Sequence, residues 1–258
     1  MAFSAEEIDR SKPARYTGEE WRLRVWLAAC YRVFDHRGWM EEIFNHITLR
    51  IPGPQKHYLI NPFGLHCGEV SATNLVKIDL AGNAVEPSAH PVNVAGFIIH
   101  SALHAARDDA HCIMHTHNPY GMAVACKADG FANDNLYAAL LYGRIAYHDF
   151  EGVTVHTDEQ PRLVKSMGDK TCLILRNHGL LVAGQDIASA FYWMSVLQRA
   201  CEIQVLTGSI PGRTLAISRK ALEASALDPQ AADPQRDMYQ KVFAAAVRRV
   251  GVRLESLF

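Results

Sequence analysis

The chain has 258 residues, of which 49% are hydrophobic and 21% charged, as is typical of an ordinary folded domain and not of a disordered segment. Its 26 Lys and Arg against 27 Asp and Glu give a formal net charge of -1, so we expect no nucleic-acid partner. The N-terminus is polar and no uncharged apolar stretch reaches the roughly 20 residues that span a bilayer, so we expect a cytoplasmic protein without membrane association.

The first half of the chain predicts a long helix, three strands and a second helix. Thr17 and Glu20 are spaced as a capping box, and apolar residues then recur at helical spacing up to Gly38. Three short runs with strand-like alternation follow and predict an antiparallel meander, at 46–52, 57–62 and 75–83. Residues 92–109 again show helical spacing.

The second half alternates strand and helix patterns. Residues 111–117 predict a short buried strand that stops at Asn118-Pro119, where another helix can begin. The remaining patterns predict strands at 144–156 and 171–179, the second ended by Gly179, and helices at 160–169 and 186–208.

These elements indicate an α/β sandwich around a mixed or antiparallel sheet, because helices and strands mix without strict βαβ alternation. We expect one domain over residues 17–208. Residues 209–258 form a C-terminal tail whose final amphipathic stripe we expect to pack on this domain or on a neighbouring subunit.

Three histidines follow two predicted strands. His115 and His117 are two residues apart, so both side chains leave a strand on the same face, and His178 ends the strand at 171–179. If the two strands end level, the three imidazoles can hold one divalent cation and leave a coordination position open for a substrate. From the residues alone, a set of buried, hydrogen-bonded histidines is an equally good interpretation.

Several longer motifs resemble the class II aldolase/adducin family. They are FNHITLRIP, the NPFG of YLINPFGLHCGEVSATNLVKIDLAGN, MHTHNPYGMAV and LILRNHGLLVAG, and the resemblance runs from Trp21 to Gly208. The sequences of these motifs resemble the adducin head domain and its bacterial relatives more closely than the sugar-phosphate aldolases. The resemblance implies a three-layer α/β/α sandwich around a mostly antiparallel mixed sheet, and a homo-oligomer, a tetramer, with active sites near subunit interfaces.

The resemblance also implies a metal site without the usual acid–base group. His115, His117 and His178 match the three histidines that hold zinc in the family's aldolases, so we expect a divalent ion, Zn²⁺ first and Mn²⁺ second. The family's acid–base Glu corresponds to Gly96, and the neighbouring phosphate-binding Ser residues are replaced by Val94 and Ala95. A phosphorylated substrate is therefore not expected.

Other residues match the family's pocket or can replace the missing Glu. Asn45 and Gly64 match substrate-lining positions, and Tyr137 matches a Tyr that a neighbouring subunit delivers. With Tyr137, the candidate catalytic groups are His148 and Asp149, and His100 and Tyr120 are further alternatives. His100 and His104 also fit a purely packed and hydrogen-bonded role on an apolar helix.

We therefore predict a divalent-metal-dependent carbon–carbon lyase acting on a non-phosphorylated hydroxy, oxo or aromatic carboxylic acid through a metal-stabilised enolate. Decarboxylation and retro-aldol cleavage both remain open, and the missing Glu favours decarboxylation, which needs no base at its first step. The alternatives are a non-catalytic adducin-like assembly module and a sugar-phosphate aldolase or epimerase.

Overall fold

The computed structural model describes residues 2–153, 156–227 and 229–258. Its strands are β1 (His46–Arg50), β2 (Tyr58–Ile60), β3 (Val76–Ile78), β4 (Cys112–Thr116), β5 (Ile145–His148), β6 (Cys172–Leu175) and β7 (Gly179–Gly184). Its α-helices are α1 (Ala5–Arg10), α2 (Gly18–His36), α3 (Val94–Ala106), α4 (Pro119–Ala125), α5 (Leu136–Leu140), α6 (Gln160–Met167), α7 (Ile187–Gly208), α8 (Arg219–Ser225) and α9 (Met238–Val250). Among these helices, none has the length and apolar character needed to cross a bilayer.

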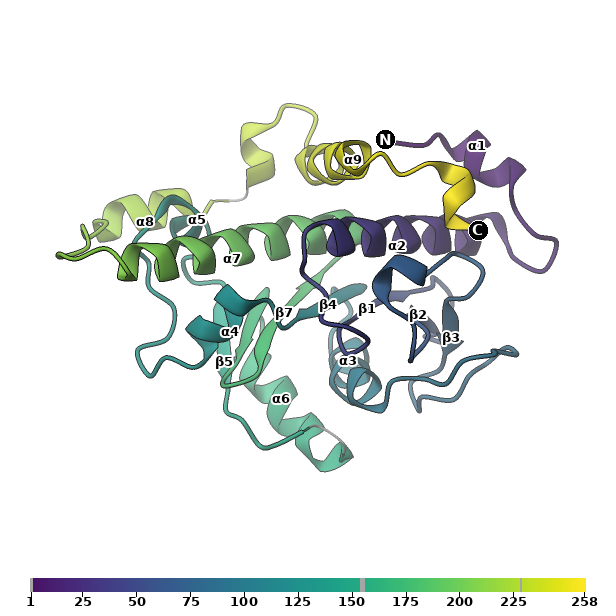
Figure 1. Cartoon of the computed structure of the whole chain (residues 1–258), viewed down its shortest axis with the longest axis horizontal. Coiled ribbons are helices and arrows are strands. Elements are labelled where there is room, and N and C mark those ends of the chain that lie inside the picture. The colour runs from purple at the N-terminus through teal and green to yellow at the C-terminus, as the bar shows by residue number, and fades with distance from the viewer. Residues whose placement is uncertain (1, 154–155, 228) are drawn as a thin grey trace.

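One mixed sheet with the strand order β3-β2-β1-β4-β7-β6-β5 forms the middle layer of the described chain. Neighbouring strands are antiparallel except β5 and β6, which are parallel. Helices α2, α7 and α9 lie over one face of the sheet, and α3 and α6 lie over the other (Figure 1). The structure thus confirms the expected three-layer α/β/α sandwich around a mostly antiparallel mixed sheet.

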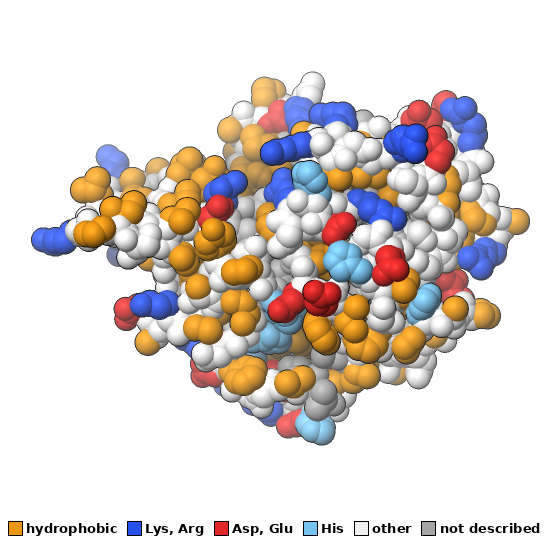
Figure 2. Space-filling view, in the orientation of Figure 1, with side chains coloured by type: hydrophobic (Ala, Val, Ile, Leu, Met, Phe, Trp, Pro, Cys, Tyr) orange, Lys and Arg blue, Asp and Glu red, His pale blue; other side chains and the backbone are white. Residues whose placement is uncertain are grey.

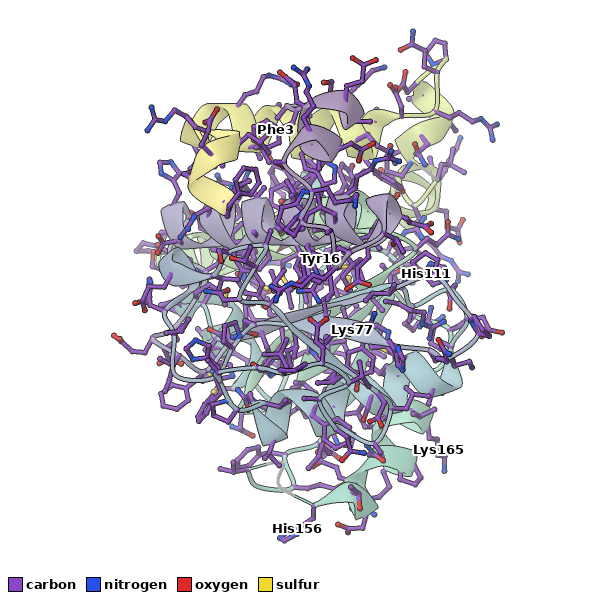
Figure 3. All side chains as sticks on the ribbon, turned by 90° about the vertical axis from the view of Figure 1, so that its right-hand side faces the viewer. Phe3, Tyr16, Lys77, His111, His156 and Lys165 are labelled. Atoms are coloured by element: carbon purple, nitrogen blue, oxygen red, sulfur yellow. The ribbon has the colours of Figure 1, made fainter. Side chains whose placement is uncertain are left out.

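The larger hydrophobic core lies between the sheet and the layer of α2, α7 and α9. Phe191 of α7 and Phe243 of α9 pack with ring centroids 5.2 Å apart, so part of the 209–258 segment contributes to the main core. Phe3 lies in the same layer (Figure 3), with its ring 5.4 Å from that of Trp26 in α2. Both ends of the chain therefore pack on this layer, while an independent domain ending at residue 208 stays a prediction.

The second core, between the sheet and α3 with α6, positions the start of α3. Leu103 of α3 and Leu163 of α6 pack on this face of the sheet. Asn93 caps α3 by accepting a hydrogen bond of 3.2 Å from the N–H of Gly96, and its Nδ2 donates to the carbonyl of Phe44 at 3.5 Å. The first turn of α3 is thereby held against the segment that leads into β1.

Two predicted strands differ from the observed ones. The segment 171–179 is not one strand, because β6 ends at Leu175, residues 176–178 turn, and Gly179 begins β7. Of the segment 144–156, only Ile145–His148 forms a strand, and residues 154–155 lie outside the described part of the chain. The helix expected to begin at Pro119 is confirmed as α4.

The predicted start of α2 is correct at Thr17, whose side chain accepts a hydrogen bond of 3.1 Å from the N–H of Glu20. The Glu20 carboxylate pairs with Arg24 at 3.0 Å and with Lys77 of β3 at 2.8 Å. Arg24 is fully buried, and a buried guanidinium requires such a carboxylate partner. Glu20 therefore joins α2 to the edge of the sheet, and its carboxylate does not complete the predicted capping box with Thr17.

Candidate metal centre

The three predicted histidines meet at one end of the central strands. His115 lies near the end of β4, His117 follows that strand, and His178 lies in the turn between β6 and β7. Because β7 runs antiparallel to β4, the start of β7 lies beside the end of β4 and brings the turn to the pair. One ring nitrogen from each of the three lies within 4.8 Å of those of the other two.

The turn that delivers His178 depends on its two neighbours. Asn177 adopts the left-handed conformation with φ 56°, which asparagine tolerates better than most residues. Gly179 was predicted to be needed for a turn, but it is needed for a close approach between strands. A Cβ there would lie 2.4 Å from the carbonyl oxygen of Thr116 and 3.1 Å from Cδ2 of His117. Only glycine lets β7 begin so close to the end of β4.

Hydrogen bonds fix which nitrogen of each paired ring faces its neighbour. Nδ1 of His115 donates to the carbonyl of Leu180 at 3.0 Å, and Nδ1 of His117 donates to Oε2 of Glu41 at 2.9 Å. In the neutral rings, both Nε2 atoms are then unprotonated. These two atoms lie 2.8 Å apart, a contact between two lone pairs that a shared cation would relieve. This donor set and the outer hydrogen bonds fit a divalent metal ion.

The electrostatics of His115 and His178 also favour neutral imidazoles. Burial lowers the pKa of His115 well below its usual value, and the neighbouring His178 and His117 lower it further. Burial, with smaller contributions from His117 and His148, lowers the pKa of His178 to about 4. Since a metal ligand must be unprotonated, the fold keeps these rings ready to bind a cation at neutral pH.

A fourth histidine occupies the space beside Gly96, where the family resemblance expects a Glu. His46 begins β1 directly opposite His115, and the two ring centroids lie 5.0 Å apart. A Cβ on Gly96 would lie 2.7 Å from Cδ2 and 2.8 Å from Cγ of His46. The His46 imidazole therefore fits in this position only because Gly96 has no side chain.

A chain of buried hydrogen bonds extends from His46. Its Nδ1 lies 3.1 Å from Nε2 of His100, Nδ1 of His100 lies 2.8 Å from Oγ1 of Thr48, and Thr48 lies 2.7 Å from Nε2 of His104. Nδ1 of His104 lies 2.7 Å from the carbonyl oxygen of Ala110. Burial lowers the pKa of all three histidines, to about 3 for His46 and His104, so the rings are neutral.

The acceptor at the end of this series of hydrogen bonds, the Ala110 carbonyl, fixes the position of every proton between it and His46. The Ala110 carbonyl can only accept, so His104 must donate from Nδ1 and accept at Nε2 from the Thr48 hydroxyl. Thr48 must then accept from Nδ1 of His100, whose Nε2 accepts from His46. The remaining nitrogen of His46, Nε2, is left unprotonated. His100 and His104 thus have the packed, hydrogen-bonded role weighed from the sequence, and they set the tautomer of His46.

The metal centre opens into a cavity of about 430 Å³. Its polar lining is His46, His115, His117, His178, Glu41, Asn93 and Asn177. Its other lining residues are Phe44, Ile99, Met122, Phe150, Gly152 and Val153. Within the described chain, no Lys or Arg lines this cavity, so it offers a mostly apolar surface beside the imidazoles.

The predicted substrate-binding residues do not line that cavity. Asn45 is buried directly before His46, its Oδ1 accepts from the N–H of Glu41 at 2.6 Å, and its Nδ2 has no hydrogen-bond partner in the described chain. Gly64 lies in the loop after β2 with φ 96°. A role of either residue toward a substrate stays a prediction.

The predicted catalytic residues lie in three different surroundings. Tyr137 is half-buried on α5, which packs on α7. His148 is buried at the end of β5 and contacts Ser166 and Glu159, at 3.0 and 3.1 Å. Asp149 is exposed and pairs with Arg176 at 3.3 Å. His148 and Asp149 border a smaller hollow that His178 also lines, whereas Tyr120 lines a separate cavity.

Two residues of this centre were missed by the sequence analysis, namely Glu41 and His46. His46 lies inside the recognised FNHITLRIP motif, and its place opposite His115 depends on the register of β1 with β4. Glu41 reaches His117 from a loop, and no periodic pattern marks it. The sequence offered a signal only for His46, which is a histidine at the start of a predicted strand.

The chain is similar to known proteins in sequence. The family described as "Class II Aldolase and Adducin N-terminal domain" matches residues 26–205, which include all four histidines of the cavity. Over 210 residues the chain is 44% identical to alpha-adducin of Rattus norvegicus, covering 80% of this chain and 28% of that protein.

Two solved structures extend the likeness to the fold. An aldolase II superfamily protein from Pseudomonas syringae is 36% identical, with a TM-score of 0.84 over 91% of this chain and 95% of that one. An L-fuculose 1-phosphate aldolase from Glaciozyma antarctica PI12 is 27% identical, with a TM-score of 0.77 over 94% of this chain and 97% of that one.

Proposed function

This chain belongs to the class II aldolase and adducin family, and we propose that it is a divalent-metal-dependent carbon–carbon lyase. The observation that supports this most directly is the convergence of three imidazoles, within 4.8 Å of one another, on a cavity of about 430 Å³. A site with three protein ligands and adjacent free space is typical of catalytic rather than structural metal centres.

His115, His117 and His178 would hold the ion, with Zn²⁺ proposed first and Mn²⁺ second. The ion supplies a Lewis acid that stabilises the negative charge of an enolate when the carbon–carbon bond breaks. The chain's own part is to orient the ligands, since the Leu180 carbonyl and Glu41 hold His115 and His117 in the required tautomers.

His46 is the group that we propose in place of the missing Glu. Its unprotonated Nε2 can accept a hydrogen bond from a substrate hydroxyl, as the alcohol of a retro-aldol reaction requires. Burial lowers the pKa of His46 to about 3, so the resting ring is neutral and acts as a hydrogen-bond acceptor. Retro-aldol cleavage and decarboxylation are therefore both chemically accessible in this cavity.

The lining of the cavity supports a non-phosphorylated substrate. Phosphate is usually held by cationic side chains or a cradle of backbone N–H groups, and none of the described residues lining this cavity is Lys or Arg. Phe44, Met122 and Phe150 offer apolar contacts instead. We propose a small hydroxy, oxo or aromatic carboxylic acid.

We also propose that the chain forms a homo-oligomer, a tetramer, in which Tyr137 reaches the site of a neighbouring subunit. Tyr137 lies on α5, apart from the residues that line the cavity of its own chain. His148 and Asp149 stay further candidates for the later proton transfer, because they border the hollow beside His178. A monomer in light scattering would contradict the assembly and Tyr137's role.

The test of the main proposal combines metal content with product analysis. We expect about one divalent ion per purified chain, and we expect His178→Ala to lose that ion and all lyase activity while keeping the circular dichroism spectrum. The matched control is His111→Ala, since His111 is exposed, is not one of the three proposed ligands and does not line their cavity. Assays on hydroxy-keto acids and aromatic carboxylates follow aldehyde, pyruvate and carbon dioxide separately. Full activity of His178→Ala would refute the proposal.

An assembly module is the second candidate, favoured by the 44% identity to alpha-adducin. It predicts that the purified chain holds no stoichiometric divalent ion and takes up none when zinc or manganese is added. Metal analysis therefore separates the two candidates before any substrate is known.

A further inference from the structure

A second cavity of about 370 Å³ lies close to the candidate metal centre. It opens where the end of α2, the middle of α7 and α9 come together, and Figure 2 shows basic side chains gathered over this region. Trp39 and Asn118 line it, whereas Glu41 and His117, two and one residues away along the chain, line the metal cavity. The same two short segments thus form a wall between both cavities.

The lining of this second cavity is strongly cationic. Arg37 follows α2, Arg199 lies on α7 and Arg249 lies on α9, so three different elements each contribute one guanidinium. The only carboxylate among the described lining residues is that of Glu202, which pairs with Arg199 at 2.6 Å. Neither Arg37 nor Arg249 has a carboxylate within ion-pair distance in the described chain.

Arg37 is held rigidly in this unpaired state. Its guanidinium stacks over the rings of Trp39 and Phe191, 4.7 and 4.9 Å from their centroids, and Nη1 donates to Oγ of Ser195 at 3.2 Å. Burial, followed by repulsion from Arg249, lowers the pKa of Arg37. Its position just after α2 places it near the negative end of the helix dipole, which offsets about half a unit charge at most.

Gln198 is a buried polar residue in the wall of the same cavity, with its side chain 4% exposed. Nε2 donates to Oγ1 of Thr116 at 2.7 Å, but Oε1 is buried without a hydrogen-bond partner in the described chain. Buried amide oxygens are nearly always paired, so this side chain is an incompletely satisfied part of the cavity wall.

We propose that this cavity binds a small dianionic oxyanion, such as a phosphate monoester or a dicarboxylate. The guanidinium groups of Arg37, Arg199 and Arg249 surround the anion from three elements, as suits an oxyanion with several peripheral oxygens. This site does not depend on the lyase activity proposed above, because it uses none of the residues of the metal cavity.

Calorimetric titration of the full chain, freed of metal by a chelator, tests the proposal without binding at the histidines. The probes are glycerol 3-phosphate and malate, which distinguish the two sources of the oxyanion. We expect saturable binding of at least one probe, weakened at least tenfold by Arg249→Gln. The control is Arg248→Gln, an exposed neighbour on α9 that does not line the cavity, for which we expect less than a twofold change.

A second variant guards against a folding defect. Glu202→Gln removes the only lining carboxylate and should strengthen binding at least threefold, a gain that a damaged fold would not produce. Absence of saturable binding of both probes to the unmodified chain would overturn the proposal. Equal affinities in Arg249→Gln and Arg248→Gln, or unchanged affinity in Glu202→Gln, would overturn it as well.

Discussion

Substitution of Gly96 by Ala tests the steric link between α3 and the metal centre. The backbone of Gly96 is ordinary helix, so a Cβ meets no conformational strain of its own. The new methyl would, however, lie 2.7, 2.8 and 3.0 Å from Cδ2, Cγ and Nε2 of His46. Favourable carbon contacts begin at about 3.5 Å, so the ring or the first turn of α3 must move by most of an ångström.

The expected cost follows from three opposing effects. Overpacking costs about 1–3 kcal/mol, and although His46 lines the cavity, its hydrogen bond to His100 holds the ring against α3. Weakening the hydrogen bond from His46 to His100 costs about 1 kcal/mol more. The higher helix propensity of Ala returns about 1 kcal/mol. We expect Gly96→Ala to lower the free energy of unfolding by about 1–3 kcal/mol.

Urea unfolding of the chelator-treated chain measures this difference. Gly208→Ala is the matched control, because Gly208 is also helical and no atom lies within 4 Å of its added Cβ, so that variant should be neutral or slightly more stable. In a His46→Ala background the cost of Gly96→Ala should disappear. Equal stability of the two alanine variants, or the same cost in both backgrounds, would refute the steric explanation.

Three further predictions concern the same centre. Glu41→Gln should weaken zinc binding about 10- to 100-fold in a competition titration, because the carboxylate orients His117; an unchanged affinity would exclude that role. Burial lowers the pKa of His46 to about 3 and that of His178 to about 4, below the usual value of about 6.5, so the unfolded chain binds protons that the native chain does not. Stability should therefore be full above about pH 6.5 and fall on acidification by up to about 1.4 kcal/mol per pH unit for each ring, which urea unfolding at pH 7.5 and 5.5 will show. Thr48→Val should leave two buried imidazole nitrogens unpaired and alter the ¹⁵N shifts that report the tautomer of His46; unchanged shifts would contradict the deduced proton order.

The three histidines that we propose as metal ligands could be located from the sequence because the signals that place them are local. Strand alternation and the turn at Asn118 fix the end of β4, and a glycine follows His178. The interpretation of that glycine was nevertheless incomplete. The left-handed residue is Asn177, and Gly179 is needed for its close approach to Thr116, a contact between strands that are more than 60 residues apart in the chain.

The rest of the centre could not be predicted, because contacts between segments far apart in the chain place its residues. His46 faces the cavity only because β1 pairs with β4 in one register, and a shift by a single residue would turn it to the opposite face of the sheet. Its tautomer depends on the Ala110 carbonyl, at the far end of four hydrogen bonds. The antiparallel hairpin of β6 and β7 was missed because the segment 171–179 was interpreted as one strand ended by Gly179, although the polar residues 176–178 interrupt the apolar run where the turn lies.

The close contact between Gly96 and the His46 ring gives a second explanation for the missing carboxylate. From the sequence, Gly96 indicates only the loss of an acid–base group. In the structure, any side chain at position 96 would collide with the His46 imidazole, which already fills that part of the cavity and offers a nitrogen lone pair there. Gly96 therefore allows the imidazole of His46 to face the cavity, and this neutral ring adds no negative charge beside Glu41, as a carboxylate would. The exchange of carboxylate for imidazole suits the anionic substrate that we propose, because it removes a source of repulsion.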